Sequence, residues 1–198
     1  MDPDELRVKG YFASKGLRAE RFSKAETRAG KTPDFRVFQN DTLLFYCEVK
    51  SSPEDRWLDK QFEGVPPGTL VGGARPDPIF NRLTKDIHAA VKQFEAANGD
   101  QQHPNVLALV NHDDMCNVHD LIGVLTGNFY GESGTTSPIY KQYSEGRIQG
   151  DRSKIHLFIW LDDQKPEGLL FGQSHDAHHE TLCKAFGVDP RGIRQIGS

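Results

Sequence analysis

Asp34, Glu48 and Lys50 carry side chains of the types that metal-assisted hydrolysis uses. Two neighbouring carboxylates repel each other, and one is driven toward protonation unless a cation lies between them. Carboxylate oxygens suit Mg²⁺, which keeps several of its waters and also binds phosphate oxygens. Such a metal stabilises charge on phosphoryl oxygens and lowers the pKa of a bound water, which an adjacent lysine can orient. The three residues therefore predict a divalent-metal site with an assisting lysine, provided that the chain brings them together.

Two apolar stretches, residues 32–38 and 43–50, carry these residues and predict the strands of a hairpin. Side chains alternate between the two faces of a strand, so Glu48 and Lys50 lie on one face and Val49 on the other. No other Glu-x-Lys string occurs in the chain. The side chains predicted to face the core are Leu43, Phe45, Cys47 and Val49.

The length of the hairpin turn decides whether Asp34 joins the other two residues. A three-residue turn at Asn40–Thr42 places Asp34 directly opposite Glu48, and opposed residues share a face with Cβ atoms about 4.5–5.5 Å apart. A two-residue turn at Asn40-Asp41 instead places Asp34 opposite Cys47, on the other face. The register of this hairpin is thus the critical step in the prediction.

The composition favours one soluble domain over residues 1–198, with a core of about residues 2–110 and a C-terminal elaboration of about residues 111–198. The net charge of −4 argues against a binder that relies on positive charge alone, but it is compatible with an acidic site beside a local basic track. No apolar run reaches membrane-spanning length, and the acidic start lacks the features of a secretory leader. The cysteines are odd in number and far apart, which predicts reduced thiols and a cytoplasmic location.

The periodicity of apolar residues predicts the remaining elements. Asp2 is suited to cap a first helix that ends at Gly16, with Glu5 at the third position of a capping box. A second helix is predicted from about Phe80 to Ala97. Strands are predicted at residues 17–23, 106–110 and 155–161. The expected order is helix, three strands, helix and strand.

The Pro-Asp34 pair and the Glu48-Val49-Lys50 string, in this order of elements, resemble the PD-(D/E)xK nuclease superfamily. The resemblance covers roughly residues 2–110. It implies an α/β fold with a restriction-endonuclease-like core, in which a central mixed β-sheet is flanked by helices in the order αβββαβ, with C-terminal additions.

The resemblance also implies a function. In that family the aspartate and glutamate, here Asp34 and Glu48, bind Mg²⁺ or Mn²⁺, the carbonyl of the spacer residue, here Val49, often joins them, and the lysine, here Lys50, assists the attacking water. We therefore expect a metal-dependent nuclease that hydrolyses phosphodiester bonds, with DNA favoured as substrate and endonuclease action favoured over exonuclease action.

Further residues are weighed against simpler explanations. Many members of the family add a glutamate from the first helix, and Glu5 fits that position, although its capping role explains it as well. The helix after the hairpin can lend a basic or amide side chain to the scissile phosphate. The residues that we consider for nucleic-acid binding on that helix are Lys85, Lys92 and Gln93, for which a solvated helix face is the commoner explanation.

Two alternative functions and two protein partners stay open at this stage. The chain could be an inactive nucleic-acid-binding module of the same fold, or a zinc protein that uses His175, His179 and Cys183, which line up at helical spacing. An exposed helix explains the same three residues. A homodimer, and an inhibitor protein if the nuclease is a toxin, are the protein partners considered. The long segment 52–79 is predicted to grip the substrate.

Overall fold

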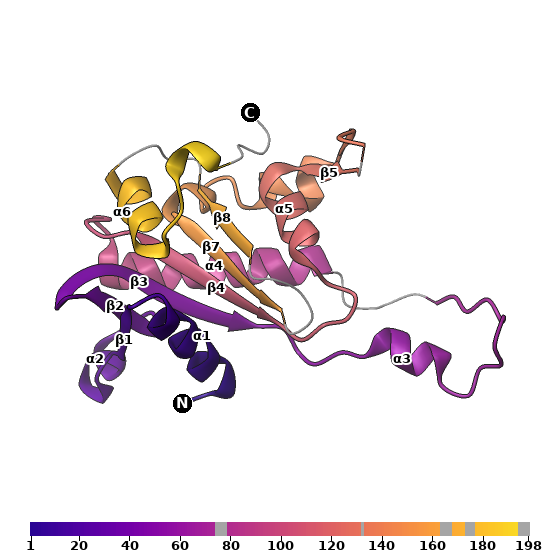
Figure 1. Ribbon diagram of the computed structural model, residues 1–198, viewed down its shortest axis with the longest axis horizontal. Helices are drawn as coiled ribbons and strands as arrows, with labels where there is room; N and C mark the ends of the chain where they lie inside the picture. The colour runs from indigo at the N-terminus through magenta and orange to yellow at the C-terminus, as the bar shows by residue number, and fades with distance from the viewer. Residues whose placement is uncertain (74–78, 132, 163–167, 173–176, 194–198) are drawn as a thin grey trace.

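The computed structural model describes residues 1–73, 79–131, 133–162, 168–172 and 177–193. Within these ranges the chain forms an α/β structure in which helices cover both faces of a six-stranded mixed sheet (Figure 1). The sheet has the order β1-β2-β3-β4-β7-β8. Its strands are β1 (Arg18–Arg21), β2 (Phe35–Gln39), β3 (Thr42–Ser51), β4 (Asn105–Asn111), β7 (Leu157–Asp162) and β8 (Gly168–Phe171).

The first three strands pair antiparallel, β3, β4 and β7 pair parallel, and β8 returns antiparallel to β7. The C-terminal part of the chain therefore supplies two strands of the main sheet. The helices are α1 (Pro3–Ser14), α2 (Lys24–Ala29), α3 (Trp57–Phe62), α4 (Ile79–Asn98), α5 (Val118–Thr126) and α6 (Ala177–Phe186). A separate ribbon consists of β5 (Asn128–Tyr130) and β6 (Thr136–Pro138).

Two apolar clusters lie on opposite faces of the sheet. The first joins Val8 and Phe12 of α1 with Leu182 of α6, and the second joins residues of α4 and α5. Every residue of β4 is buried, as expected for a strand that is covered on both faces. Because β3 runs beside β4, its alternate side chains must also enter these two clusters.

The hairpin turn between β2 and β3 has two residues, and a β-bulge next to it shifts the pairing register of the two strands by one residue. Asn40 and Asp41 have positive φ angles of 47° and 63°, the conformation of a tight two-residue hairpin turn. This turn pairs Phe38 with Leu43, but the register shifts between Val37 and Phe38, so that Phe35 lies opposite Cys47. The bulge inserts one extra residue into β3 and restores the register that a three-residue turn would give.

The core face of β3 differs from the prediction at one position. Phe45, Cys47 and Val49 enter the first apolar cluster as predicted, but Leu43 does not. Leu44 packs against that cluster instead, because the bulge at this point moves it to the face of Phe45. The alternation that the sequence predicts therefore begins only after the bulge.

The predicted helices are present, and two further helices, α2 and the short α3, were not predicted. Asp2 caps α1 with the capping box that includes Glu5, and α4 spans the predicted range. Helix α2 begins after Ser23 and has its own capping box with Glu26, a spacing that sequence analysis could have used. Among the described residues, no helix combines the length and the apolar character needed to cross a membrane.

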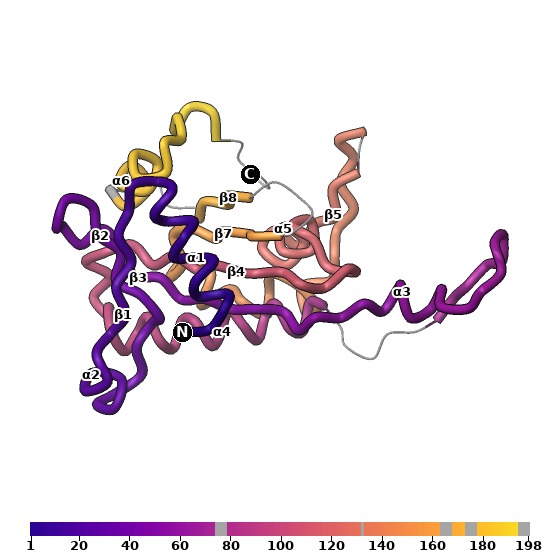
Figure 2. The backbone as a smooth tube through the Cα atoms, turned by 60° about the horizontal axis from the view of Figure 1, so that its bottom comes forward, coloured from indigo at the N-terminus to yellow at the C-terminus, as the bar shows by residue number. Residues whose placement is uncertain are grey.

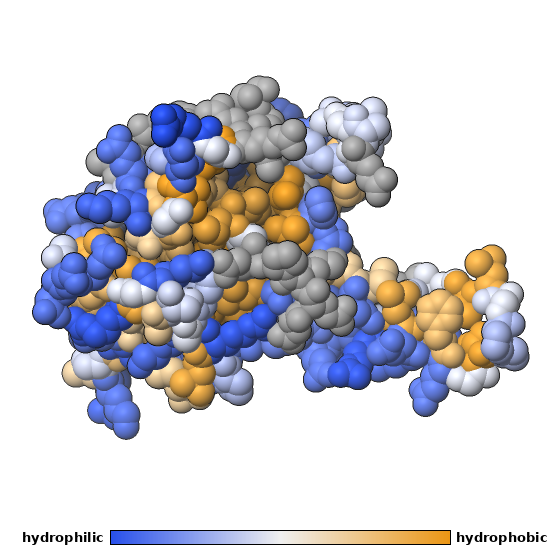
Figure 3. All heavy atoms as spheres, in the orientation of Figure 1, coloured by the Kyte–Doolittle hydropathy of each residue, from blue (hydrophilic) through white to orange (hydrophobic). Residues whose placement is uncertain are grey.

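Residues 52–73 form an arm that projects from the body and contains the six-residue helix α3 (Figures 1 and 2). Apolar side chains gather along the arm (Figure 3), and Leu70 is 98% exposed. The arm carries four acidic residues, Glu54, Asp55, Asp59 and Glu63, against the two basic residues Arg56 and Lys60. This charge of −2 opposes contact with phosphate and does not favour the substrate-gripping role predicted for segment 52–79.

The register yields a direct test by disulfide formation. The double variant Asp34→Cys/Glu48→Cys, in a Cys47→Ala background, should form an intramolecular disulfide, because directly opposed residues have the Cα separation that a disulfide needs. Mass spectrometry after alkylation of free thiols measures the bond. The control variant Asp34→Cys with native Cys47 should keep both thiols free. A disulfide in the control, and none in the double variant, would contradict the bulged register.

Candidate active site

Asp34 lies just before β2 and meets Glu48 across the hairpin. Phe35 is opposite Cys47, so the next pair toward the open end of the hairpin is Asp34 and Glu48. Oδ2 of Asp34 accepts a hydrogen bond from the backbone N–H of Val49 at 2.8 Å. This contact fixes the aspartate at the edge of β3, next to the glutamate, and the two predicted carboxylates are thereby brought together.

Glu48 is 1% exposed and is more deeply buried than Asp34. Nζ of Lys50 lies 2.5 Å from its Oε1, as expected for residues two apart on one face of a strand. Its other oxygen, Oε2, is buried and makes no hydrogen bond with any described part of the chain. A buried acceptor without a partner is costly, so this oxygen is suited to a cation or a donor that the protein itself does not supply.

The surroundings of Glu48 also change its acidity. Burial, followed by the negative charge of Asp34, raises the pKa of Glu48 to about 8, although the ammonium group of Lys50 opposes the shift. The free energy needed to ionise Glu48 is therefore higher than in water. A divalent cation beside Oε2 would favour the ionised form.

The carbonyl of Val49 lies at the same edge as the carboxylate of Asp34. The backbone N–H groups of Tyr46 and Ser52 donate to carbonyls on the β4 side, at 3.0 and 2.9 Å. Val49 is an odd number of residues from both, so its N–H and C=O are directed toward β2. Pairing with β2 ends at Phe35, before it reaches Val49. Three oxygen-bearing groups thus meet where the hairpin opens.

Helix α4 covers this face of β3 and adds two charged residues beside Lys50. Arg82 and Asp86, four residues apart, line a cavity of about 10 Å³ together with Lys50. The indole Nε1 of Trp160, which lines the same cavity, is buried without a hydrogen bond in the described structure. A space of this size is about that of one water molecule. The i, i+4 spacing at the edge of the apolar stripe could have identified Arg82 and Asp86.

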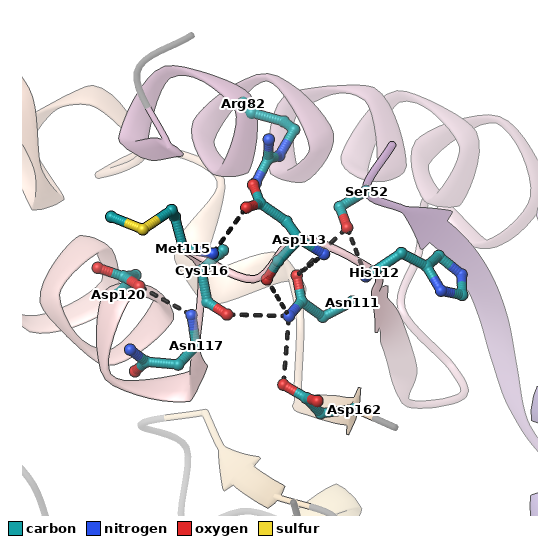
Figure 4. A network of polar contacts seen from close by, with 10 residues as sticks. All are labelled: Ser52, Arg82, Asn111, His112, Asp113, Met115, Cys116, Asn117, Asp120 and Asp162. Atoms are coloured by element: carbon teal, nitrogen blue, oxygen red, sulfur yellow. Dashed lines mark hydrogen bonds and ion pairs between the residues drawn. The ribbon is translucent and has the colours of Figure 1, made fainter. Parts of the chain in front are cut away.

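The ends of β3, β4 and β7 are joined by a network of polar contacts (Figure 4). Arg82 lies 2.6 Å from the carboxylate of Asp113, whose side chain is fully buried. The backbone N–H of His112 donates to Oγ of Ser52 at 2.7 Å, and the side-chain amide of Asn111 donates to the carboxylate of Asp162 at 3.2 Å. These contacts fix the strand ends and hold Arg82 beside Lys50.

Glu5 makes contacts of a different kind from those of the carboxylate pair. Its Oε2 accepts from the backbone N–H of Asp2 at 3.3 Å, and the same oxygen lies 3.0 Å from the guanidinium of Arg21. The first contact supports the capping explanation, the second ties α1 to β1, and no hydrogen bond among the described residues joins Glu5 to Asp34 or Glu48. Its role as a further acid stays a prediction.

The predicted nucleic-acid-binding residues of α4 divide into two kinds. Lys85 and Lys92 are exposed, whereas Gln93 is half-buried. Oε1 of Gln93 is buried and has no hydrogen-bond partner in the described structure. The two lysine side chains thus lie on the exposed side of α4, and the amide of Gln93 lies on the buried side.

The histidine-rich helix shows little that supports zinc binding. His175 lies outside the described residues. His179 packs against the ring of Phe171 with centroids 5.1 Å apart, and Cys183 is 1% exposed. Burial raises the pKa of the Cys183 thiol, which disfavours the thiolate that zinc requires. Within the described ranges, no group of three or more His, Cys, Asp and Glu residues is arranged to hold a metal.

Comparisons with known proteins do not assign the chain to a family. No protein-family model matches the sequence, and neither curated proteins nor solved structures give a match. The functional conclusion therefore depends on the geometry of the residues described above.

The raised pKa of Glu48 predicts how stability depends on pH in metal-free protein. Between the unfolded pKa of about 4.5 and the folded pKa of about 8, the unfolded state loses the proton of Glu48 while the folded state keeps it. This contribution to stability is complete below about pH 4.5 and is lost as the pH rises to about 8. We expect Glu48→Gln to gain on the order of 2 kcal/mol relative to wild type between pH 6 and pH 9.

Urea unfolding at the two pH values, in the presence of a chelator, measures this difference. The exposed Glu63 provides a matched control, since Glu63→Gln removes the same charge outside the site and should show no such gain. A Glu48→Gln variant whose stability follows that of wild type from pH 6 to pH 9 would contradict the assigned environment of Glu48.

Proposed function

We propose that the protein is a metal-dependent nuclease that hydrolyses phosphodiester bonds, with DNA as the favoured substrate. The observation that carries the proposal is the buried Oε2 of Glu48, an acceptor without a partner beside Asp34 and Lys50. A structural ion pair between Glu48 and Lys50 would not require a second carboxylate at the same point. The three side chains together have the composition of a metal site with an assisting base.

The residues present fit a divalent cation. Asp34 and Glu48 supply two carboxylates, and the carbonyl of Val49 lies at the same edge of the strand. Few protein ligands, all of them hard oxygens, suit Mg²⁺ or Mn²⁺ better than zinc. When bound, the cation would supply positive charge to the phosphoryl oxygens and lower the pKa of a coordinated water.

The side chains of the chain itself have separate tasks in this proposal. Asp34 is held by the N–H of Val49, so its free oxygen keeps a fixed direction. Lys50 neutralises charge on the substrate and orients the attacking water. Arg82, held by Asp113, adds a second positive charge beside Lys50. The buried strand β4, which pairs with β3 at Glu48, excludes bulk water from one side of the pair.

The proposal includes a restriction-endonuclease-like core as the finer description of the fold. Three features support it: the antiparallel β1–β3, the crossover through α4, and the parallel pairing of β3 with β4. The pair of carboxylates lies where the hairpin opens, at the junction of antiparallel and parallel strands. The nuclease hypothesis also carries four predictions: endonuclease action, a cytoplasmic location, a homodimer, and an inhibitor protein if the nuclease is a toxin.

An inactive nucleic-acid-binding module of the same fold is the main rival. It would bind DNA or RNA without cleaving either, so binding and cleavage must be measured on the same preparation. The zinc alternative has less support, because Cys183 is buried in the core with a raised thiol pKa.

Cleavage assays with single-residue variants test the proposal. Plasmid, linear and branched DNA and RNA are incubated with Mg²⁺ or Mn²⁺, and product formation is followed on gels. Asp34→Ala and Lys50→Ala should each reduce the rate by about 10²-fold or more, because the first removes a metal ligand and the second the assisting group. The exposed residues Lys9 and Asp100 provide charge-matched controls, and Lys9→Ala and Asp100→Ala should cleave at the wild-type rate.

The enzyme proposal fails if activity survives both Asp34→Ala and Lys50→Ala, or if no substrate is cleaved under any condition. Binding of nucleic acid without cleavage would support the inactive module instead. A chelator should abolish cleavage, and excess Mg²⁺ should restore it.

A further inference from the structure

The segment between α5 and β7 encloses a second, larger cavity of about 570 Å³. We call it the turn cavity, because three short 3-10 turns form it: η1 (Lys141–Tyr143), η2 (Glu145–Arg147) and η3 (Arg152–Lys154). Its volume falls within the range of about 300–1,000 Å³ that is usual for small-molecule sites. Its polar lining residues are Lys141, Glu145, Gln149, Arg152 and Ser153.

The walls of the turn cavity are held in place by the fold. Three side-chain pairs attach the turns to α4: Arg147 with Asn81, Asp151 with His88, and Lys154 with Glu95. Ile148 is fully buried in the apolar cluster beneath the turns. Gly146 admits no side chain, because a Cβ atom there would lie 2.7 Å from the carbonyl oxygen of Lys141. The cavity is therefore a built feature of this face.

Arg152 is the residue of the turn cavity whose bonding is incomplete. Its side chain is only 20% exposed, and no hydrogen bond joins its guanidinium to any described residue. The nearest opposite charge is the carboxylate of Glu145 at 4.0 Å, beyond hydrogen-bond distance. A guanidinium has five N–H donors, and burying charged donors without acceptors is unfavourable. The same burial lowers the pKa of Arg152.

Lys141 lies on the other side of Glu145, and its side chain is exposed. Its Nζ lies 3.8 Å from Oε1 of Glu145, which again is too far for a hydrogen bond. One carboxylate thus faces two cations and bonds fully to neither. The amide of Gln149 and the hydroxyl of Ser153 add neutral donors to the same lining.

We propose that the turn cavity binds a small organic phosphate monoester, with Arg152 and Lys141 as its charged donors. The two cations attract the negatively charged monoester although Glu145 offsets one of their charges, and the terminal oxygens of the monoester accept hydrogen bonds from several directions at once. The volume leaves room for an organic group on the phosphate. The shared chemistry has two sources: a free mononucleotide, or the 5′-phosphate end of a nucleic-acid strand.

This inference does not depend on the proposed nuclease activity. The turn cavity and the cavity beside Lys50 share no lining residue. A failure of cleavage therefore leaves the phosphate site untouched, and a failure of phosphate binding leaves the carboxylate pair untouched.

Calorimetric titration of the full chain in a chelator and without added metal, with the DNA probes checked on gels for integrity afterwards, tests the inference. The probes are inorganic phosphate, deoxyadenosine monophosphate, deoxyadenosine, and short DNA with or without a 5′-phosphate. The phosphate-bearing probes should bind and deoxyadenosine should not. Preference for the mononucleotide or for the phosphorylated DNA end identifies the source of the phosphate.

Variants that change the charge of the lining in opposite directions distinguish binding in the turn cavity from nonspecific attraction of anions to the protein. Arg152→Gln should weaken binding of deoxyadenosine monophosphate about tenfold or more, and Glu145→Gln should strengthen it severalfold. Lys184→Gln removes the same charge from an exposed position outside the lining and should stay within about twofold of its parent.

Circular dichroism checks that each variant is folded, and Glu145→Gln keeps the test decisive if Arg152→Gln does not fold. Absence of binding by inorganic phosphate and deoxyadenosine monophosphate would overturn the inference. An equal loss in Arg152→Gln and Lys184→Gln, or no strengthening in Glu145→Gln, would also overturn it.

Discussion

The pairing register of β2 on β3 is the constraint on which the rest of the site depends. One residue of slip would turn Asp34 to the face of Cys47 and bury its carboxylate among apolar side chains. The β-bulge before Phe38 prevents this, because it compensates for the two-residue turn at Asn40-Asp41. The turn and the bulge have to be considered together, since each alone would separate the two carboxylates.

That register places the carboxylates of Asp34 and Glu48 next to each other, and their repulsion defines the chemistry of the site. Glu48 is buried next to another carboxylate, and Lys50 neutralises only one of its two oxygens. A protein that needed Glu48 for stability alone would be better served by a neutral side chain of the same shape. The arrangement instead suits an ion that the chain binds from solution, and the raised pKa of Glu48 links that binding to proton release.

Strand alternation predicts the shared face of Glu48 and Lys50. The sequence also predicts Asp2 as the cap of α1 and the apolar face of α4. The sequence left two hairpin registers open; Asp34 pairs with Glu48 as in the register of the three-residue turn, but through a two-residue turn and a bulge that period-2 alternation cannot reveal. Leu43 was misplaced for the same reason. Arg82 and Asp113 are 31 residues apart in sequence, so only the packing of α4 on the strand ends could reveal their contact.

The most direct measurement of the central claim is anomalous diffraction from crystals soaked in Mn²⁺. The account predicts one Mn²⁺ peak in contact with the carboxylates of Asp34 and Glu48 and with the carbonyl of Val49, and it predicts that the peak disappears in Glu48→Gln crystals. Peaks found only elsewhere, or a peak at this point that persists in Glu48→Gln, would contradict it.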